Sequence, residues 1–201
     1  TGEYRIGAEL LVNSPFKMGD LLTLNALTSD QDLTYARISY SMPAGGSGLK
    51  LGAAYSDTGY RVGKEFAALS SHGTASSSSL FATYPFMRSQ ASNLFGTLTW
   101  EKKQLDDQSI LAITSKQVQL FSLGLNGNHQ DALGGAGITS YDLTLVAGRL
   151  SMDLADIFSW VQYDFARIDG DYARLAYNVN RVQRLTDTDS MSGRLSGQRA
   201  S

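Results

Sequence analysis

Short segments of this chain alternate apolar and polar residues with a period of two. Between positions 4 and 13, one row holds Tyr4, Ile6, Ala8, Leu10 and Val12, and the other holds Arg5, Gly7, Glu9, Leu11 and Asn13. Two is the repeat of a β-strand, whose successive side chains point to opposite faces of a sheet. The pattern therefore predicts strands with one apolar face and one polar face.

The same alternation recurs along the chain and predicts an all-β fold. We expect strands at residues 4–13, 20–28, 33–42, 48–61, 76–85, 92–105, 116–126, 140–150, 172–185 and 190–199. Parallel neighbours would need connections of a dozen or more residues, usually helical, and no clear helix separates these segments. We therefore predict an antiparallel meander of about ten strands.

Composition narrows the function classes. Only 18% of the residues are charged, against roughly 25% in typical soluble domains. The net charge of −2 argues against nucleic acid as a partner, and the lack of cysteine excludes disulfides and thiolate metal sites. His72 and His129 lie far apart in loop-like sequence and are interpreted as solvated residues rather than ligands. We expect no metal and no cofactor.

No set of residues predicts catalysis. Ser71, His72 and Asp57 supply the residue types of a catalytic triad, but the strand–turn–helix context of a nucleophile elbow is missing. The acidic pairs Asp106–Asp107 and Asp187–Asp189 are expected in turns, without the regular oxygen spacing of a calcium loop. We therefore do not expect an enzyme.

The apolar rows have two possible surroundings. A soluble sandwich would turn them toward a core, whereas a membrane barrel would turn them toward lipid and its polar rows toward a wet lumen. No apolar run approaches the ~20 residues of a membrane-spanning helix, but a barrel strand needs only ~10 residues to span. Both interpretations are compatible with the alternation alone.

Polar residues in mid-strand bear on this choice, because an arginine or lysine facing lipid costs roughly 2–4 kcal/mol at the midplane. In a membrane barrel they would face the lumen, and in a soluble domain they would face solvent. The residues predicted to face the lumen are Arg5, Glu9, Arg37, Lys50, Asp142, Arg174, Arg194 and Gln198.

The links suggest which end of such a barrel is which. Pro15, Pro43 and Pro85 are each expected where a strand ends, and their short links all fall at one end of the meander. Tight turns are typical of the periplasmic side. The link 126–139 is long for that end, and the apolar link 153–171 lies at the opposite end.

Aromatic residues near the predicted strand ends fit an interfacial girdle. They are Tyr4, Tyr40, Tyr55, Tyr84, Phe86, Trp100, Tyr141 and Tyr172.

The links also resemble those of a known family. Asn13-Ser-Pro-Phe-Lys-Met-Gly-Asp20 resembles the Asn-x-Pro-x-x-x-Gly-Asp turn of two-partner secretion transporters. These haemolysin secretion/activation proteins are outer-membrane barrels related to the POTRA-bearing barrel-assembly machinery. Five further matches follow in the family's order, at residues 40–52, 84–89, 133–137, 181–185 and 195–198. Together the six span nearly the whole chain.

The resemblance implies a barrel of about sixteen strands that exports a large partner protein, unfolded, through the bacterial outer membrane. Residues 1–201 would form a single internal segment of that barrel. The POTRA domains, the first strand, the closing strands and the inward-folding loop with its Val-Arg-Gly-Tyr motif would lie outside it. The implied partners are the secreted protein and outer-membrane lipid, and the complete barrel would be monomeric.

Two other functions stay open at this point. A surface adhesin or structural outer-membrane barrel would use its long loops to bind a host or matrix component. A soluble all-β binding domain would bury the apolar rows in a core, with its charged rows on the solvent face.

Overall fold

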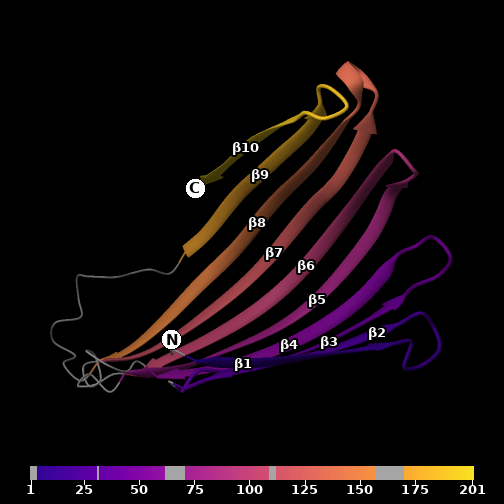
Figure 1. The fold of residues 1–201 in the computed structure, drawn as a ribbon. Coiled ribbons are helices and arrows are strands. Elements are labelled where there is room, and N and C mark those ends of the chain that lie inside the picture. The colour runs from indigo at the N-terminus through magenta and orange to yellow at the C-terminus, as the bar shows by residue number, and fades with distance from the viewer. Residues whose placement is uncertain (1–3, 31, 62–70, 109–111, 157–169) are drawn as a thin grey trace.

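The structure is a computed structural model that describes residues 4–30, 32–61, 71–108, 112–156 and 170–201. They form one antiparallel sheet in which every strand pairs with its neighbours in sequence (Figure 1). The strands are β1 (Arg5–Asn13), β2 (Leu21–Ser29), β3 (Thr34–Pro43), β4 (Lys50–Arg61), β5 (His72–Arg88), β6 (Ser92–Gln108), β7 (Ala112–Asp131), β8 (Gly137–Asp156), β9 (Gly170–Arg184) and β10 (Ser190–Ala200). The predicted ten-strand meander is confirmed. None of the described residues forms a helix long and apolar enough to span a bilayer.

The middle strands are longer than the alternation predicted. β7 and β8 have 20 residues each, and β5 and β6 have 17 each. The expected loops near Ala75, Asp106 and Ser115 are instead strand ends, because the ladder hydrogen bonds continue where the apolar row stops. The link predicted to be long, 126–139, is reduced to residues 132–136. This end of the sheet therefore has only short turns.

Pro85 is also placed differently from the prediction. It lies inside β5, where the register with β6 shifts between Pro85 and Met87, and the strand continues to Arg88. A bulge tolerates a residue that cannot donate to the ladder. Pro15 and Pro43 do lie at strand ends, as predicted. The apolar stretch 157–169 lies outside the described residues.

The strand register separates the side chains into two faces. Residues directly opposite one another on antiparallel strands share a face, so the pairs Leu10–Leu24 and Leu24–Ile38 extend the apolar row of β1 across the sheet. Large apolar side chains on this face are exposed, among them Ile38 (47%) and Leu123 (47%). The alternate residues form the polar face.

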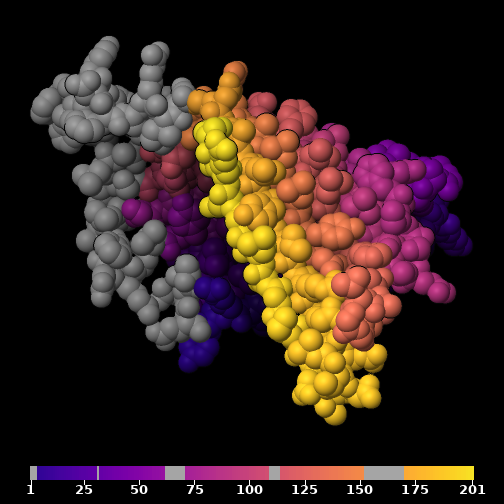
Figure 2. Space-filling model, turned by 90° about the horizontal axis from the view of Figure 1, so that it is seen from above, coloured from indigo at the N-terminus to yellow at the C-terminus, as the bar shows by residue number. Residues whose placement is uncertain are grey.

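The polar face is the concave one. Seen from above, the sheet bends into an open trough with β10 at one edge (Figure 2). Side chains on the inside of a bend crowd together, and along β3 and β4 the polar row is mostly the less exposed. Among the described residues, the buried apolar side chains are Ala54 and Val146, both on this face. No apolar core exists in the described part of the chain.

The apolar band on the convex face runs obliquely across the strands. The ladder from Leu10 reaches Tyr55 on β4, then Lys102 on β6 and Arg149 on β8. On β9, eight strand-to-strand steps from β1, this row reaches Asp171, six residues before Tyr177 in the middle of the apolar row. At ~3.3 Å per residue and ~4.8 Å per strand, a shift of six residues over eight steps corresponds to a tilt of roughly 30°. Barrel strands in membranes tilt by about 35–45°. The oblique band is the pattern of a tilted barrel wall.

Glycines let aromatic rings lie flat across neighbouring strands. Gly127 is directly opposite Tyr141, and Gly197 is directly opposite Tyr177. A Cβ at Gly197 would lie 2.6 Å from the Tyr177 hydroxyl oxygen, and one at Gly127 would lie 2.8 Å from the Tyr141 ring. The same pairing joins Gly148 to Tyr172 on the concave face. These strand glycines are sites of close packing.

Candidate pore-lining face

The register places all eight residues that were predicted to line a lumen on the concave face. Glu9 is linked to Arg37 through Asn25. Lys50 is linked to Gln198 by an unbroken row of paired residues across β5 to β9. Arg5 lies in the row of Glu9 on β1. Asp142, Arg174 and Arg194 lie on the same face of β8, β9 and β10, because each is an even number of residues from a member of the line that joins Lys50 to Gln198.

Further charged residues on this face were missed by the sequence analysis. Glu101 accepts a hydrogen bond from Ser77 at 2.6 Å and lies 3.4 Å from the Lys103 ammonium. Asp107 accepts a hydrogen bond from Tyr60 and lies 3.6 Å from the Lys116 ammonium. Glu101 and Lys103 fell within the expected strand 92–105 but were not singled out, whereas Asp107 was expected in a turn. The charges at this end compensate one another.

The remaining charges of the concave face are less constrained. Within the described part of the chain, Glu9, Arg37, Lys50 and Arg174 have no ion-pair partner. Arg194 donates to the Asn178 amide oxygen at 2.7 Å. The face therefore offers charges of both signs and free hydrogen-bonding groups to whatever occupies the trough.

Several smaller predictions change in the structure. His72 and His129 lie in strands β5 and β7 rather than in loops, and His129 Nδ1 is 2.6 Å from the Ser92 hydroxyl. Asp106 and Asp107 lie in β6 rather than in a turn. The convex row of β6 is polar here, at Gln104, Asp106 and Gln108, so the sequence lacks the apolar alternation that marks a strand. Asp187 and Asp189 do lie in a turn, between β9 and β10.

The predicted girdle aromatics lie mostly on the convex face. Tyr40, Tyr84 and Tyr141 share it near the short turns, and Tyr55 and Trp100 share it toward the opposite end. Tyr172 is an exception, because its pairing with Gly148 puts it on the concave face.

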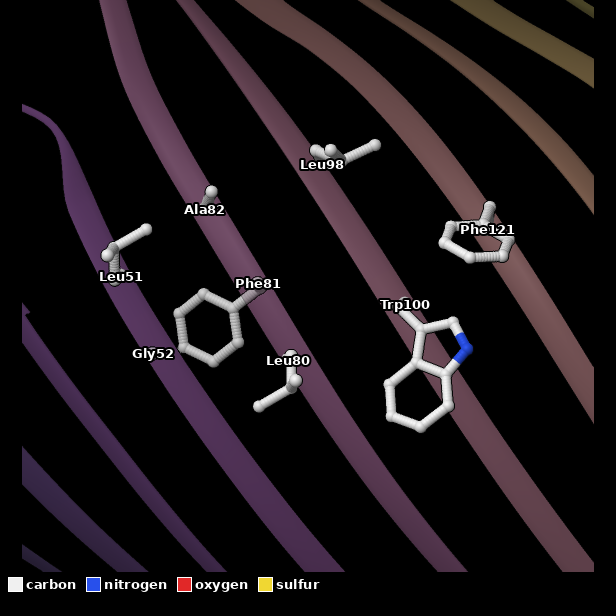
Figure 3. A pocket seen from close by; sticks show the side chains of 8 residues that line it. All are labelled: Leu51, Gly52, Leu80, Phe81, Ala82, Leu98, Trp100 and Phe121. Atoms are coloured by element: carbon white, nitrogen blue, oxygen red, sulfur yellow. The ribbon is translucent and has the colours of Figure 1, made fainter.

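From β2 to β9, the convex face between these aromatic levels is apolar, whereas Arg199 on β10 lies on this face opposite Leu175. A shallow groove on it is lined by Leu80, Leu98, Trp100 and Phe121 (Figure 3). The next residues outward on β6 and β7, Lys102 and Gln119, are polar. The apolar band is therefore closed at this border by a change to polar residues.

Comparison with known proteins decides the family. The family described as haemolysin secretion/activation protein ShlB/FhaC/HecB matches residues 1–155. The chain belongs to this family.

Individual relatives of the chain are longer proteins. The heme/hemopexin transporter protein HuxB of Haemophilus influenzae strain KW20 Rd is 24% identical over 201 residues, covering 98% of this chain and 35% of that protein. HuxB of strain 86-028NP is 29% identical over 155 residues, covering 75% of this chain and 27% of that protein. This chain therefore spans about a third or less of the length of these relatives.

A solved structure shares the fold. CdiB from Acinetobacter baumannii superposes with a TM-score of 0.66 at 17% sequence identity, covering 98% of this chain and 35% of that chain. The similarity shows that the ten-strand sheet shares the fold of that chain.

In this member of the ShlB/FhaC/HecB family, the first motif builds a closed turn around Asp20. This carboxylate is 2% exposed and accepts hydrogen bonds from the Phe16 and Met18 amides, both at 3.2 Å. It also accepts one from the Tyr40 hydroxyl at 3.0 Å. Tyr40 opens the second motif, so the first two motifs contact each other.

Two later motifs also meet. The Arg181 guanidinium donates to Asp131 at 2.8 and 2.9 Å, and the Gln183 amide donates to the carbonyls of Leu133 and Gly134 at 2.7 and 3.0 Å. Arg184 donates to the Gly135 carbonyl at 2.8 Å. Residues 181–184 thus fasten the turn 132–136. Motifs that are separate in the sequence therefore contact each other in pairs, and each pair supports a turn at one end of the sheet.

Asp20 gives a test of these supports. Burial raises the pKa of Asp20, but hydrogen bonds from Met18, Tyr40 and Phe16 outweigh it and hold the pKa below its ordinary value. A lowered folded-state pKa contributes stability at neutral pH, and this is lost as the pH falls through that value. Asp20→Asn is expected to lower the urea midpoint of the full-length barrel in vesicles at neutral pH, and less so at about pH 3.

The control is Asp187→Asn, in the exposed turn between β9 and β10. This variant is expected to unfold like the wild type at both pH values. An equal loss from Asp20→Asn at both values would contradict a stabilising role for the ionised carboxylate.

Proposed function

We propose that this chain is part of the wall of an outer-membrane transporter that exports a large partner protein in unfolded form. The observation that supports the proposal is the pairing of an exposed apolar convex face with a polar concave face on one tilted sheet. Lipid contacts the first face, and the second lines a wet passage. The short turns face the periplasm, and the opposite ends of the strands face the cell exterior.

The chain forms a segment of a larger barrel. Residues 1–201 supply ten of its strands, while periplasmic domains, the first strand and the closing strands are supplied by other parts of the full-length protein. The complete barrel acts as a monomer. Strands contributed on both sides satisfy the edge hydrogen-bonding groups of β1 and β10, which would otherwise template aggregation.

Transport proceeds by passive conduction and needs no chemical step. Charged and amide side chains on the concave face keep the passage hydrated and offer hydrogen bonds to the backbone of the moving chain. No bond is made or broken in the exported protein, and no cofactor takes part.

Export can be tested directly. The full-length transporter and the large secreted protein encoded beside it are co-expressed in a Gram-negative host that lacks both. We expect the secreted protein in the culture medium only when the transporter is present. A transporter that folds in the outer membrane while the partner stays in the periplasm would contradict the proposal and would favour a simple adhesin barrel.

A further inference from the structure

Asparagines gather at one place on the concave face. The chain has seven asparagines. Five of them lie on two neighbouring ranks, a rank being a line of directly paired residues that crosses the strands. These five, on β6, β7 and β9, are Asn93, Asn126, Asn128, Asn178 and Asn180. One rank runs through Asn128, Ser140 and Asn180, and the next runs through Asn126, Asp142 and Asn178. We call these five asparagines, with Ser140 and Ser196, the amide patch.

This concentration needs a reason other than strand formation, because asparagine is among the residues depleted in strands. Some of the amides support one another: Asn93 donates to the Asn128 oxygen at 3.1 Å. Asn126 and Asn180 make no side-chain hydrogen bond to any other described residue. Asn126 and Asn128 are exposed on the concave surface, and Asn180 is half-buried. Free donors and acceptors therefore point into the trough.

The chemistry of the patch matches a peptide backbone. An amide side chain carries both a donor and an acceptor, as a peptide group does. Along an extended chain, groups that point the same way recur every two residues, at about 6.7 Å. Asn126 and Asn128 repeat at that interval on β7, as do Asn178 and Asn180 on β9. A chain running along these strands meets a matching amide at each repeat.

The near-neutral charge of the patch suits a chain that must move. Charged hydrogen bonds are about twice as strong as neutral ones and depend on the partner's charge. A passage works when binding is favourable enough for entry, yet weak and repeated enough for exit. The patch itself carries no charged residue, and the two charged residues that share its ranks between β6 and β10, Asp142 and Arg194, have opposite signs. Its contacts are sequence-independent and individually weak.

We propose that the amide patch is a binding track for the backbone of an extended polypeptide in transit. The inference rests on the proposed export function and deepens it, because it assigns the contact to named residues. The exported polypeptide binds through its peptide groups, irrespective of its side chains. It advances by exchanging one amide partner for the next amide, which lies two residues further along the strand.

The main test compares three forms of the full-length transporter. In the first, Asn126→Leu, Asn128→Leu and Asn180→Leu are combined. The second replaces the same residues with glutamine, which keeps the amide. The third is Asn25→Leu, on the same face but beside Glu9 and Arg37. Pulse-chase labelling measures the export rate, and mobility in unheated gels measures the amount of folded barrel.

We expect the leucine triple variant to export about tenfold more slowly per folded barrel, since about three weak hydrogen bonds are lost. The glutamine triple variant and Asn25→Leu are expected to export at rates near that of the wild type. Equal export rates per folded barrel in the leucine and glutamine triple variants would contradict the proposal that the amide patch is a binding track. If the wild type exports nothing, the proposed function itself fails, which is a distinct result.

A second measurement does not depend on export in cells. Full-length transporter in a planar bilayer is exposed to an unfolded glycine- and serine-rich polypeptide, and the duration of current blocks is recorded. The leucine triple variant is expected to shorten the blocks about tenfold, with unchanged current before the polypeptide is added. A changed resting current would mean that the patch holds a resident segment of the transporter, and would overturn the proposal.

Discussion

Leu143→Arg is expected to block assembly of the barrel, whereas Ser196→Arg is expected to be tolerated. Leu143 lies on the convex face between Leu125 and Tyr177, in the middle of the apolar band, and is 41% exposed. An arginine facing lipid at the midplane costs about 2–4 kcal/mol, or roughly 30- to 1,000-fold in the folding equilibrium. The measurement is the fraction of full-length barrel that resists unfolding in unheated gels.

Ser196 is a control matched for depth. It shares a rank with Asn178 and Asp142, and Asp142 immediately precedes Leu143 in the chain. Both positions therefore lie at nearly the same level of the barrel wall but on opposite faces. Leu51→Arg should behave like Leu143→Arg, because Leu51 is paired with Met42 and Ala82 on the convex face. Equal losses from Leu143→Arg and Ser196→Arg would contradict the assignment of the two faces.

Gly127→Val is expected to destabilise the folded barrel by about 1–3 kcal/mol, the usual cost of overpacking. A Cβ at Gly127 would overlap the Asn93 carbonyl oxygen and the ring of Tyr141. The carbonyl belongs to the strand backbone and cannot move without loss of ladder pairing. The ring would have to leave the position that it occupies across the neighbouring strand. The urea midpoint of the full-length barrel in vesicles measures the loss.

Gly193→Val is the matched control, because no atom lies within 4 Å of a Cβ built there. Gly193 lies on the same face as Gly127, so both changes add the same apolar side chain toward lipid. We expect the urea midpoint of Gly193→Val to stay near that of the wild type. A similar decrease in both variants would mean that valine disturbs these strands by a route other than contact with the aromatic ring.

The existence of the strands and the division into faces were predictable, since both follow from alternation. The strand ends of β5 to β8 were not. Beyond the apolar band both faces are polar, as at Asp106 on the convex face and Asp107 on the concave face, and only the ladder shows that the sheet continues. Pro85 looked like a strand terminator because its bulge depends on pairing with β6.

The alternation predicted which residues of each strand share a face, but not how the residues of the concave face interact. The cost of a charge facing lipid was enough to assign Arg37 and Arg194 to one face. The hydroxyl groups that donate to Glu101 and Asp107, those of Ser77 and Tyr60, come from other strands, and sequence alone does not fix the register of those strands. The asparagines were overlooked because asparagine normally indicates turns. Their significance depends on the alignment of β7, β8 and β9.

The unequal strand lengths have a consequence for the shape of the passage. On β7, the nine residues from Ala112 to Leu120 precede Phe121, where the continuous apolar row of the convex face ends, and they extend the wall by about 30 Å along the strand. On β2 and β3, the turn follows within a few residues of Ala26 and Ala36. In the proposed orientation the outer mouth is bevelled. On the proposed export route, a chain that has cleared the membrane is still flanked by β5 to β8, whereas β1 to β3 have already ended.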